Sequence, residues 1–169
     1  MNKYNAENTK GQGKKIRKNE NCWYVATRLL GIRPRSVEEL KKKLLDKKFS
    51  EPEVNDTINT LLDLKYLNDK EFAQMVCEST LAGKPKGRAA LRFKLKKYLV
   101  PEKVIKETLE KILTQEKEEE YCRKAFDSKK KTLKNKSIDN FKERQKIFGY
   151  LIRQGFSTDV VYKVIGDFQ

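Results

Sequence analysis

The sequence predicts an all-α protein built from three tandem three-helix-bundle repeats in an elongated, curved arrangement. Three observations support this fold class. Apolar and charged residues each make up 37% of the chain, with only eight Gly and four Pro, which favours solvated helices with narrow apolar faces. From residue 21 onwards, apolar residues recur with helical spacing and are separated by helix-start signals. The same pattern returns about every 50 residues, a period typical of stacked helical units.

Residues 21–68 contain the first three predicted helices. Ser36 and Glu39 match a capping box, in which the Ser hydroxyl accepts from the amide of the Glu and the Glu carboxylate reaches back to the amide of the Ser. Ser50 and Glu53 form a second capping box. The residues predicted to form the core faces of these helices are Trp23, Ala26, Leu29 and Leu30, then Leu40, Leu44 and Leu45, and finally Val54, Ile58, Leu61 and Leu62.

Residues 69–114 and 115–169 repeat this organisation, and Asp69 is expected to cap the first helix of the second unit. The positions that correspond in the three units are Leu40, Leu91 and Ile147; Leu44, Leu95 and Leu151; Phe49, Leu99 and Phe156; and Val54, Val104 and Val161. A unit of roughly 50 residues is marginal as an independent fold, so we expect the units to pack on their neighbours. A single irregular helical bundle with accidental internal similarity is the alternative.

An excess of basic residues, 39 Lys and Arg against 24 Asp and Glu, gives the chain a net charge of +15. This charge favours polyanionic partners: nucleic acid, an acidic protein surface, or a filament that carries both. Residues 1–20 have almost no apolar content and are expected to form a flexible basic tail. No apolar run approaches the ~18 residues of a membrane span, and the polar start lacks the apolar core of a signal peptide. We therefore expect a cytoplasmic monomer without a membrane role.

Several kinds of catalytic and metal chemistry are disfavoured by the residue types. There is no His, the commonest general base near neutral pH, and no phosphate-loop or nucleophile motif. Cys22, Cys77 and Cys122 are too far apart for a zinc motif, and each falls early in the first helix of a unit, where we expect it to face the core. The sequence therefore predicts a protein that is not an enzyme and that uses no cofactor or metal.

Six short motifs follow one another along the chain: Ala26–Leu30, Arg33–Ser36, Glu39–Leu44, Leu64–Asp69 with Phe72 and Ala73, Lys84–Gly87 with Leu91, and Tyr150–Phe156. In this order and spacing, over roughly residues 22–168, the chain resembles the RecX family. The family pattern includes a glycine just after the second helix of each unit, as Gly155 supplies in the third. Lys48 and Tyr98 stand at the expected positions in the other two. Because a left-handed backbone costs a non-glycine residue about 1 kcal/mol, we expect these two turns to be remodelled.

The resemblance implies a regulatory protein that binds the RecA–DNA filament along its groove. It implies inhibition of ATP hydrolysis, strand exchange and coprotease function, and therefore modulation of DNA repair and recombination. It also implies that the chain has no cofactor and no chemistry of its own. A helical DNA-binding regulator that acts on nucleic acid directly is the alternative interpretation.

Ten basic residues are candidates for contacts with the recombinase or with DNA phosphates: Arg33, Arg35, Lys84, Lys86, Arg88, Arg92, Lys96, Lys97, Lys130 and Lys131. The stretch Lys84–Lys97 contains no acidic residue. On a helix, Arg88, Arg92 and Lys96 form a stripe beside the core face, and because like charges at this spacing repel, we expect a partner that neutralises them. Phe93 lies almost opposite the core. It either packs against a neighbouring unit, which we favour, or stacks on a base or enters a partner's pocket.

Overall fold

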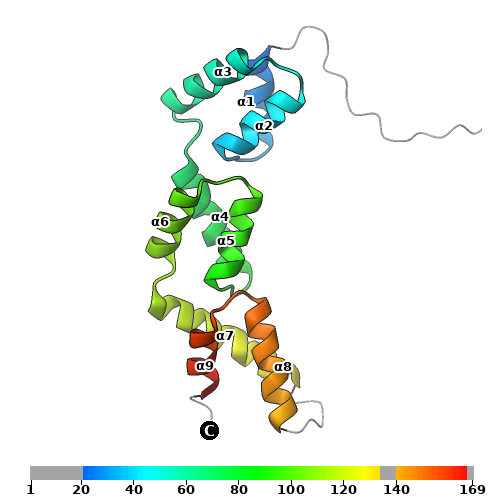
Figure 1. Ribbon diagram of the computed structural model, residues 1–169, viewed down its shortest axis with the longest axis vertical. Coiled ribbons are helices and arrows are strands. Elements are labelled where there is room, and N and C mark those ends of the chain that lie inside the picture. Colours follow the sequence, from blue (N-terminus) through cyan, green and yellow to red (C-terminus); the bar gives the residue numbers. More distant parts are fainter. Residues whose placement is uncertain (1–20, 134–139, 167–169) are drawn as a thin grey trace, which may run out of the picture.

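The computed structural model describes residues 21–133 and 140–166, and these residues form nine helices and no strand. The helices are α1 (Cys22–Ile32), α2 (Val37–Asp46), α3 (Glu51–Asp63), α4 (Asp69–Gly83), α5 (Arg88–Lys97), α6 (Glu102–Ile112), α7 (Gln115–Leu133), α8 (Asn140–Arg153) and α9 (Thr158–Gly166). This confirms the predicted all-α class (Figure 1). The tail predicted for residues 1–20 lies outside the described residues.

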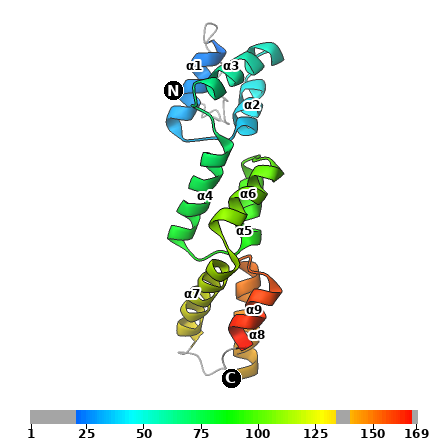
Figure 2. The ribbon, with the colours of Figure 1, turned by 90° about the vertical axis from the view of Figure 1, so that its left-hand side faces the viewer.

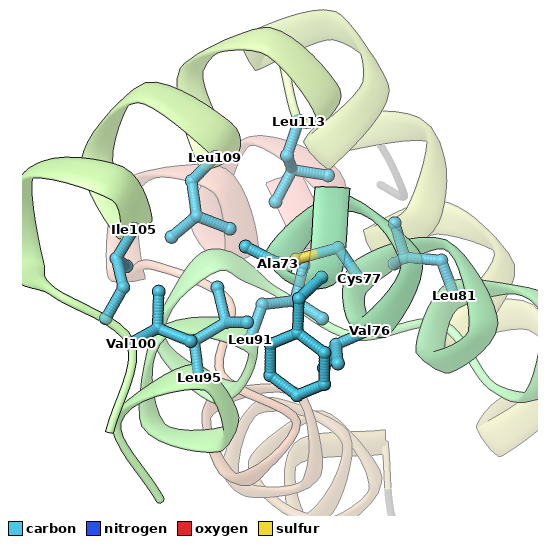
Figure 3. Packing of buried hydrophobic residues seen from close by; sticks show 11 residues of the cluster. Ala73, Val76, Cys77, Leu81, Leu91, Leu95, Val100, Ile105, Leu109 and Leu113 are labelled. Atoms are coloured by element: carbon cyan, nitrogen blue, oxygen red, sulfur yellow. The ribbon is translucent and has the colours of Figure 1, made fainter. Parts of the chain in front are cut away.

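The nine helices form three bundles that stack along the long axis of an elongated molecule (Figures 1 and 2). Within each bundle, every helix packs against the other two. Each bundle also has its own cluster of buried apolar side chains, shown for α4–α6 in Figure 3. Tyr121 packs against both the second and the third cluster. Three tandem three-helix repeats, rather than one irregular bundle, are therefore the architecture.

Ser36 and Ser50 cap their helices as predicted, but the carboxylates of Glu39 and Asp69 do not make the predicted caps. The hydroxyl of Ser36 accepts from the amide of Glu39 at 3.1 Å, and the amide of Ser50 donates to the Glu53 carboxylate at 3.0 Å. The Glu39 carboxylate does not return to Ser36, because two arginines hold it. The cap of α4 is Asn68, whose side chain accepts from the amides of Lys70 and Glu71, so the prediction that Asp69 caps this helix is wrong.

Two residues predicted to lie in the core are exposed instead: Trp23 by 36% and Leu62 by 40%. In α1 the buried face is rotated relative to the predicted one. The buried face of α1 consists instead of Cys22, Val25 and Ala26. Leu29 satisfies the helical spacing of either face, so the periodicity alone does not separate them.

The turns after the second helices have the same conformation in all three repeats. Lys48, Leu99 and Gly155 have φ values of 69°, 57° and 89°, in the left-handed region. In each turn the next residue donates its amide to a carbonyl five residues back: Phe49 to Leu44, Val100 to Leu95, and Phe156 to Leu151. The expectation that Lys48 and Tyr98 occupy remodelled turns is therefore wrong, and the left-handed residue of the second repeat is Leu99.

This turn corrects the alignment of the second repeat by one residue. Val100 and Ile105 are buried where Phe156 and Val161 are buried, whereas Leu99 is 40% exposed and Val104 is only partly buried. The corresponding core positions are therefore Leu40, Leu91 and Ile147; Leu44, Leu95 and Leu151; Phe49, Val100 and Phe156; and Val54, Ile105 and Val161.

We predict that Lys48→Gly stabilises the protein. Glycine adopts the left-handed backbone of this position without the steric cost that a Lys Cβ causes, so the free energy of unfolding should rise by about 0.5–1 kcal/mol. Urea denaturation measures the change. Lys47→Gly is the matched control, because Lys47 has an ordinary φ of −85° and glycine there should be destabilising. A lower denaturation midpoint for Lys48→Gly would contradict the prediction.

The three cysteines are buried, as the sequence predicts, with Cys77 and Cys122 completely inaccessible. Burial raises the pKa of the Cys77 thiol to about 11 and that of the Cys122 thiol to about 12. Negative charge on Glu78 and Glu118, respectively, adds to this effect. Both thiols are therefore protonated, and poor nucleophiles, at neutral pH.

We predict that iodoacetamide at pH 8 alkylates Cys77 and Cys122 only after unfolding, with labelling located by mass spectrometry. The raised pKa values also link stability to pH. Above about pH 9 the unfolded chain loses thiol protons that the folded protein retains, so the free energy of unfolding should fall as the pH rises further. Rapid modification of either thiol in 0 M urea would show that the bundle cores open readily.

Candidate partner-binding surface

The first two repeats meet where the start of α2 approaches the end of α5. The hydroxyl of Ser36 donates to the carbonyl of Tyr98. The amide of Val37 donates to the Asp69 carboxylate at 2.9 Å. The Arg33 guanidinium lies 5.3 Å from the centre of the Tyr98 ring. Burial raises the pKa of Asp69, although the hydrogen bond from Val37 partly offsets this. Asp69 therefore joins two repeats instead of capping its own helix.

The second and third repeats meet where the start of α5 approaches the end of α8. The amides of Gly87 and Ala89 donate to the carbonyls of Gln154 and Gly155, each at 3.0 Å. A Cβ on Gly87 would lie 2.2 Å from the Gly155 oxygen, so only glycine permits this approach. The buried Glu118 carboxylate accepts from the amide of Arg88 at 2.8 Å and from its Nε at 3.4 Å.

The two joints are built in the same way. In each, the amide of the first residue of a second helix, Val37 or Arg88, donates to a carboxylate from the next repeat, Asp69 or Glu118. A carboxylate is favourable there because the amino end of a helix carries partial positive charge. The joints bring α2, α5 and α8 one after another along one side of the stack, as Figure 1 shows. We call these three helices the second-helix column.

Charge is unevenly distributed between this column and the third helices of the repeats. The column contains twelve basic and four acidic residues: Lys41, Lys42, Lys43, Arg88, Arg92, Lys94, Lys96, Lys97, Lys142, Arg144, Lys146 and Arg153 against Glu38, Glu39, Asp46 and Glu143. Helices α3, α6 and α9 contain four basic and eight acidic residues: Lys103, Lys106, Lys111 and Lys163 against Glu51, Glu53, Asp56, Asp63, Glu102, Glu107, Glu110 and Asp159. The fold thus gathers positive charge on one side.

Arg35, one of the predicted contacts, is not presented at the surface. Its side chain is 7% exposed and donates to the carbonyl of Leu29 at 3.2 Å and to the Glu39 carboxylate at 2.5 Å. Arg33 donates to the same carboxylate at 3.0 Å but keeps 40% of its side chain exposed. The expectation of a partner contact is therefore corrected for Arg35, whose guanidinium anchors α2 to the end of α1.

The basic stripe of α5 is neutralised within the chain. Arg88 pairs with Glu118 and donates to the carbonyl of Leu113. Arg92 and Lys96 both pair with Glu102, at 2.6 and 3.3 Å. The sequence predicts a partner that compensates these like charges, and the structure shows that carboxylates of α6 and α7 supply that compensation. Arg92 and Lys96 are still about half exposed, whereas Arg88 belongs to the joint.

Phe93 is 66% exposed, so the favoured interpretation that it packs against a neighbouring repeat is wrong. Lys97 lies beside it, with Nζ 5.8 Å from the ring centre. Lys84 is exposed at the end of α4.

The other predicted contacts lie in separate places along the stack. Lys86 bonds Gln154 at 2.6 Å in the second joint. Lys130 lies beside Phe126, 5.6 Å from its ring, and Lys131 is exposed. The structure therefore spreads the ten candidates over both joints and the end of α7 rather than gathering them in one patch.

Sequence reasoning missed the bases that the column adds on α2 and α8, among them Lys42, Arg144 and Lys146. Aligning the second helices of the three repeats is the signal that finds them, since these helices share one side of the stack. Within the residues that the structure describes, no three His, Cys, Asp or Glu side chains are grouped closely enough to hold a metal ion. No helix in the same residues is long and apolar enough to cross a bilayer.

We predict that Glu118→Ala weakens the second joint. The change leaves the Arg88 amide without its acceptor and removes the carboxylate from its guanidinium in a partly buried site, so the free energy of unfolding should fall by about 1–3 kcal/mol. Urea denaturation measures the loss. Asp127→Ala is the matched control, because Asp127 is an exposed carboxylate on the same helix and its removal should cost less than about 0.5 kcal/mol. Equal effects of the two substitutions would argue against the joint.

Comparison with known families and structures agrees with this architecture. The family model described as the first three-helix domain of RecX matches residues 22–61, the second domain matches 68–109, and the third matches 116–165. Solved structures show the same fold. RecX from Lactobacillus salivarius has a TM-score of 0.78 at 21% identity, over 86% of this chain and 93% of that one. Another regulatory protein RecX has a TM-score of 0.73 at 22% identity, over 86% and 70%.

Curated relatives extend the similarity to sequence. Regulatory protein RecX of Chlorobium phaeobacteroides is 30% identical over 83% of this chain and 89% of its own length. That of Pelodictyon phaeoclathratiforme is 32% identical over 83% and 84%. That of Clostridium perfringens is 28% identical over 85% of this chain but 66% of its own length. With three domain models in order and relatives matched over most of their length, this chain belongs to the RecX family.

Proposed function

We propose that this protein is a RecX-type regulatory protein that binds the RecA–DNA filament and inhibits ATP hydrolysis, strand exchange and coprotease function. It thereby modulates DNA repair and recombination, without catalysis of its own and in the cytoplasm. The relatives named regulatory protein RecX support the regulatory role. The observation that carries the proposal is the second-helix column, whose three helices lie along one side of an elongated stack and contain twelve basic residues.

The second-helix column runs along the molecule and is rich in basic residues, which favours binding to an extended polyanion. A filament offers DNA phosphates and repeated protein subunits along its length, so contacts of modest strength from three repeats add together. Lys42, Lys97 and Lys146 lie on the three successive column helices, and each is exposed. No carboxylate in the described parts of the chain pairs with any of these three lysines. They are therefore available to an external acidic group.

Direct sequence reading by a helix-turn-helix mode is disfavoured by two features. Recognition helices contact base edges with their amino-terminal residues, but the starts of α2 and α5 are covered by the next repeat. Among the third helices, α3 carries four carboxylates and no basic residue and would be repelled by phosphates. The alternative of a DNA-binding regulator that acts alone is therefore less well supported than filament binding.

Inhibition by binding alone requires only that the protein bind one state of the filament more tightly than another. A tenfold preference, about 1.4 kcal/mol at room temperature, is enough to shift a balanced equilibrium strongly toward an inactive state. Contacts made by three repeats at once provide such a preference when the two filament states differ in the spacing of the groups that the repeats contact. No catalytic residue is needed in this mechanism.

We predict that the triple variant Lys42→Glu, Lys97→Glu, Lys146→Glu loses inhibition of RecA ATPase activity. Each reversal removes a contact from one helix of the column, and together they should raise the half-inhibitory concentration roughly 10- to 100-fold at about 150 mM salt. The DNA-dependent ATPase rate is measured at increasing inhibitor concentration. The matched control reverses the same number of charges on α6, with Lys103→Glu, Lys106→Glu and Lys111→Glu.

The control variant should inhibit almost as well as the unaltered protein, since its three lysines belong to α6 and not to the second-helix column. Equal inhibition by all three proteins would refute the column as the binding surface. A salt titration separates the alternative function. Tight binding to one defined naked duplex without recombinase would favour a DNA-binding regulator, whereas purely electrostatic binding to naked DNA should weaken steeply with salt.

A further inference from the structure

A groove of about 460 Å³ lies at the outer end of the third repeat, between α8 and α9. Its lining includes Arg144, the aromatic side chains Phe141, Phe148 and Tyr162, and Ile165. The rings of Phe148 and Tyr162 pack together, with centres 5.1 Å apart. Phe141 and Tyr162 are nevertheless 66% and 65% exposed. We call this groove the terminal socket.

The terminal socket is the third-repeat equivalent of a pocket that the following repeat borders within the chain. This pocket of about 570 Å³ between the second and third repeats is lined by α5 and α6 and also by Glu118, Gly155, Phe156 and Ser157 of the third repeat. The register that pairs Leu91 with Ile147 also pairs six of its residues with six of the terminal socket. The pairs are Arg88 and Arg144, Ala89 and Gln145, Arg92 and Phe148, Lys106 and Tyr162, Leu109 and Ile165, and Glu110 and Gly166.

Arg144 in the socket matches an arginine that binds a carboxylate. Its counterpart Arg88 pairs with Glu118 at 3.4 Å in the second joint. Arg144 is exposed, and no carboxylate in the described parts of the chain pairs with it. Among the described residues, the socket therefore has the cation of a joint without the anion that completes one.

The socket is also more apolar than the internal pocket. Phe148 and Tyr162 replace Arg92 and Lys106, so two aromatic rings stand where the internal pocket has cationic side chains. Exposed aromatic side chains in a concave site are a common feature of protein-binding hot spots. Their burial by an apolar side chain would add to the attraction that Arg144 exerts on a carboxylate.

We propose that the terminal socket binds a segment of a partner protein that offers a carboxylate beside an apolar side chain, as Glu118 and Phe156 do in the second joint. Resting on the proposed function, the inference assigns this segment to the protein subunits of the filament rather than to its DNA. A second copy of this chain fits less well. Its free first repeat would present Lys47 and Lys48 beside Phe49, and these lysines are repelled by Arg144.

The test combines crosslinking with a charge-neutral substitution. Tyr162 is replaced by the photoreactive residue benzoylphenylalanine, and the protein is irradiated on RecA filaments assembled on single-stranded DNA with a non-hydrolysable ATP analogue. We expect the crosslink to form with the recombinase. A crosslink to DNA or to a second copy of this chain, or no crosslink, would overturn the proposal.

The second arm measures affinity for the same filaments and for the naked DNA. The double variant Phe141→Ala, Tyr162→Ala should bind filaments roughly tenfold or more weakly, because two hot-spot aromatics are lost, while its affinity for naked DNA stays unchanged. Tyr66→Ala is the matched control, since Tyr66 is an equally exposed aromatic residue far from the socket in sequence. Unchanged helical content and urea midpoint establish that each variant is folded.

The outcomes separate this inference from the proposed function. If the unaltered protein binds and inhibits filaments and the double variant does so equally, the socket proposal fails and the function stands. Equal loss on filaments and naked DNA assigns the socket to nucleic acid and also overturns the proposal. If the unaltered protein does not bind filaments at all, both the function and the socket assignment fail together.

Discussion

The whole architecture depends on one interaction, the meeting of a helix start in one repeat with a helix end in the next. Both ends expose backbone groups without partners in their own helix. In the second joint the amides of Gly87 and Ala89 satisfy carbonyls at the end of α8, and in the first joint Ser36 satisfies the carbonyl of Tyr98. Because these bonds fix the ends of helices to one another, the repeats are held in a defined relative orientation.

The joints also decide which charges remain for a partner. Asp69 and Glu118 are drawn to helix starts, and Arg33, Arg35 and Arg88 are held by carboxylates within the chain. The second helices lie along a single side of the stack, and their Lys42, Lys97 and Lys146 are exposed to solvent. A high net charge alone does not produce such an edge. It arises because stacking by helix ends places equivalent helices of successive repeats in one line.

The terminal socket corresponds in register to the pocket that residues of the third repeat help to line at the second joint. Repeat proteins usually cover the last interface with a polar cap, because an open interface exposes apolar surface. Here the open position keeps the arginine of a joint and gains two aromatic residues, Phe148 and Tyr162, in place of bases. In our proposal, the interactions that hold one repeat to the next also serve the recognition of another protein.

The sequence by itself determined the helical class, the three repeats, the buried cysteines and the helix starts at Ser36 and Ser50, because these follow from local spacing and local hydrogen bonds. Tertiary structure alone decided that Asp69 binds Val37, that Val100 rather than Leu99 is buried, and that Phe93 is exposed. Helical periodicity defines a face only to within about a residue. Which group a carboxylate or an aromatic ring contacts, by contrast, depends on the neighbouring repeat, which lies far away in sequence.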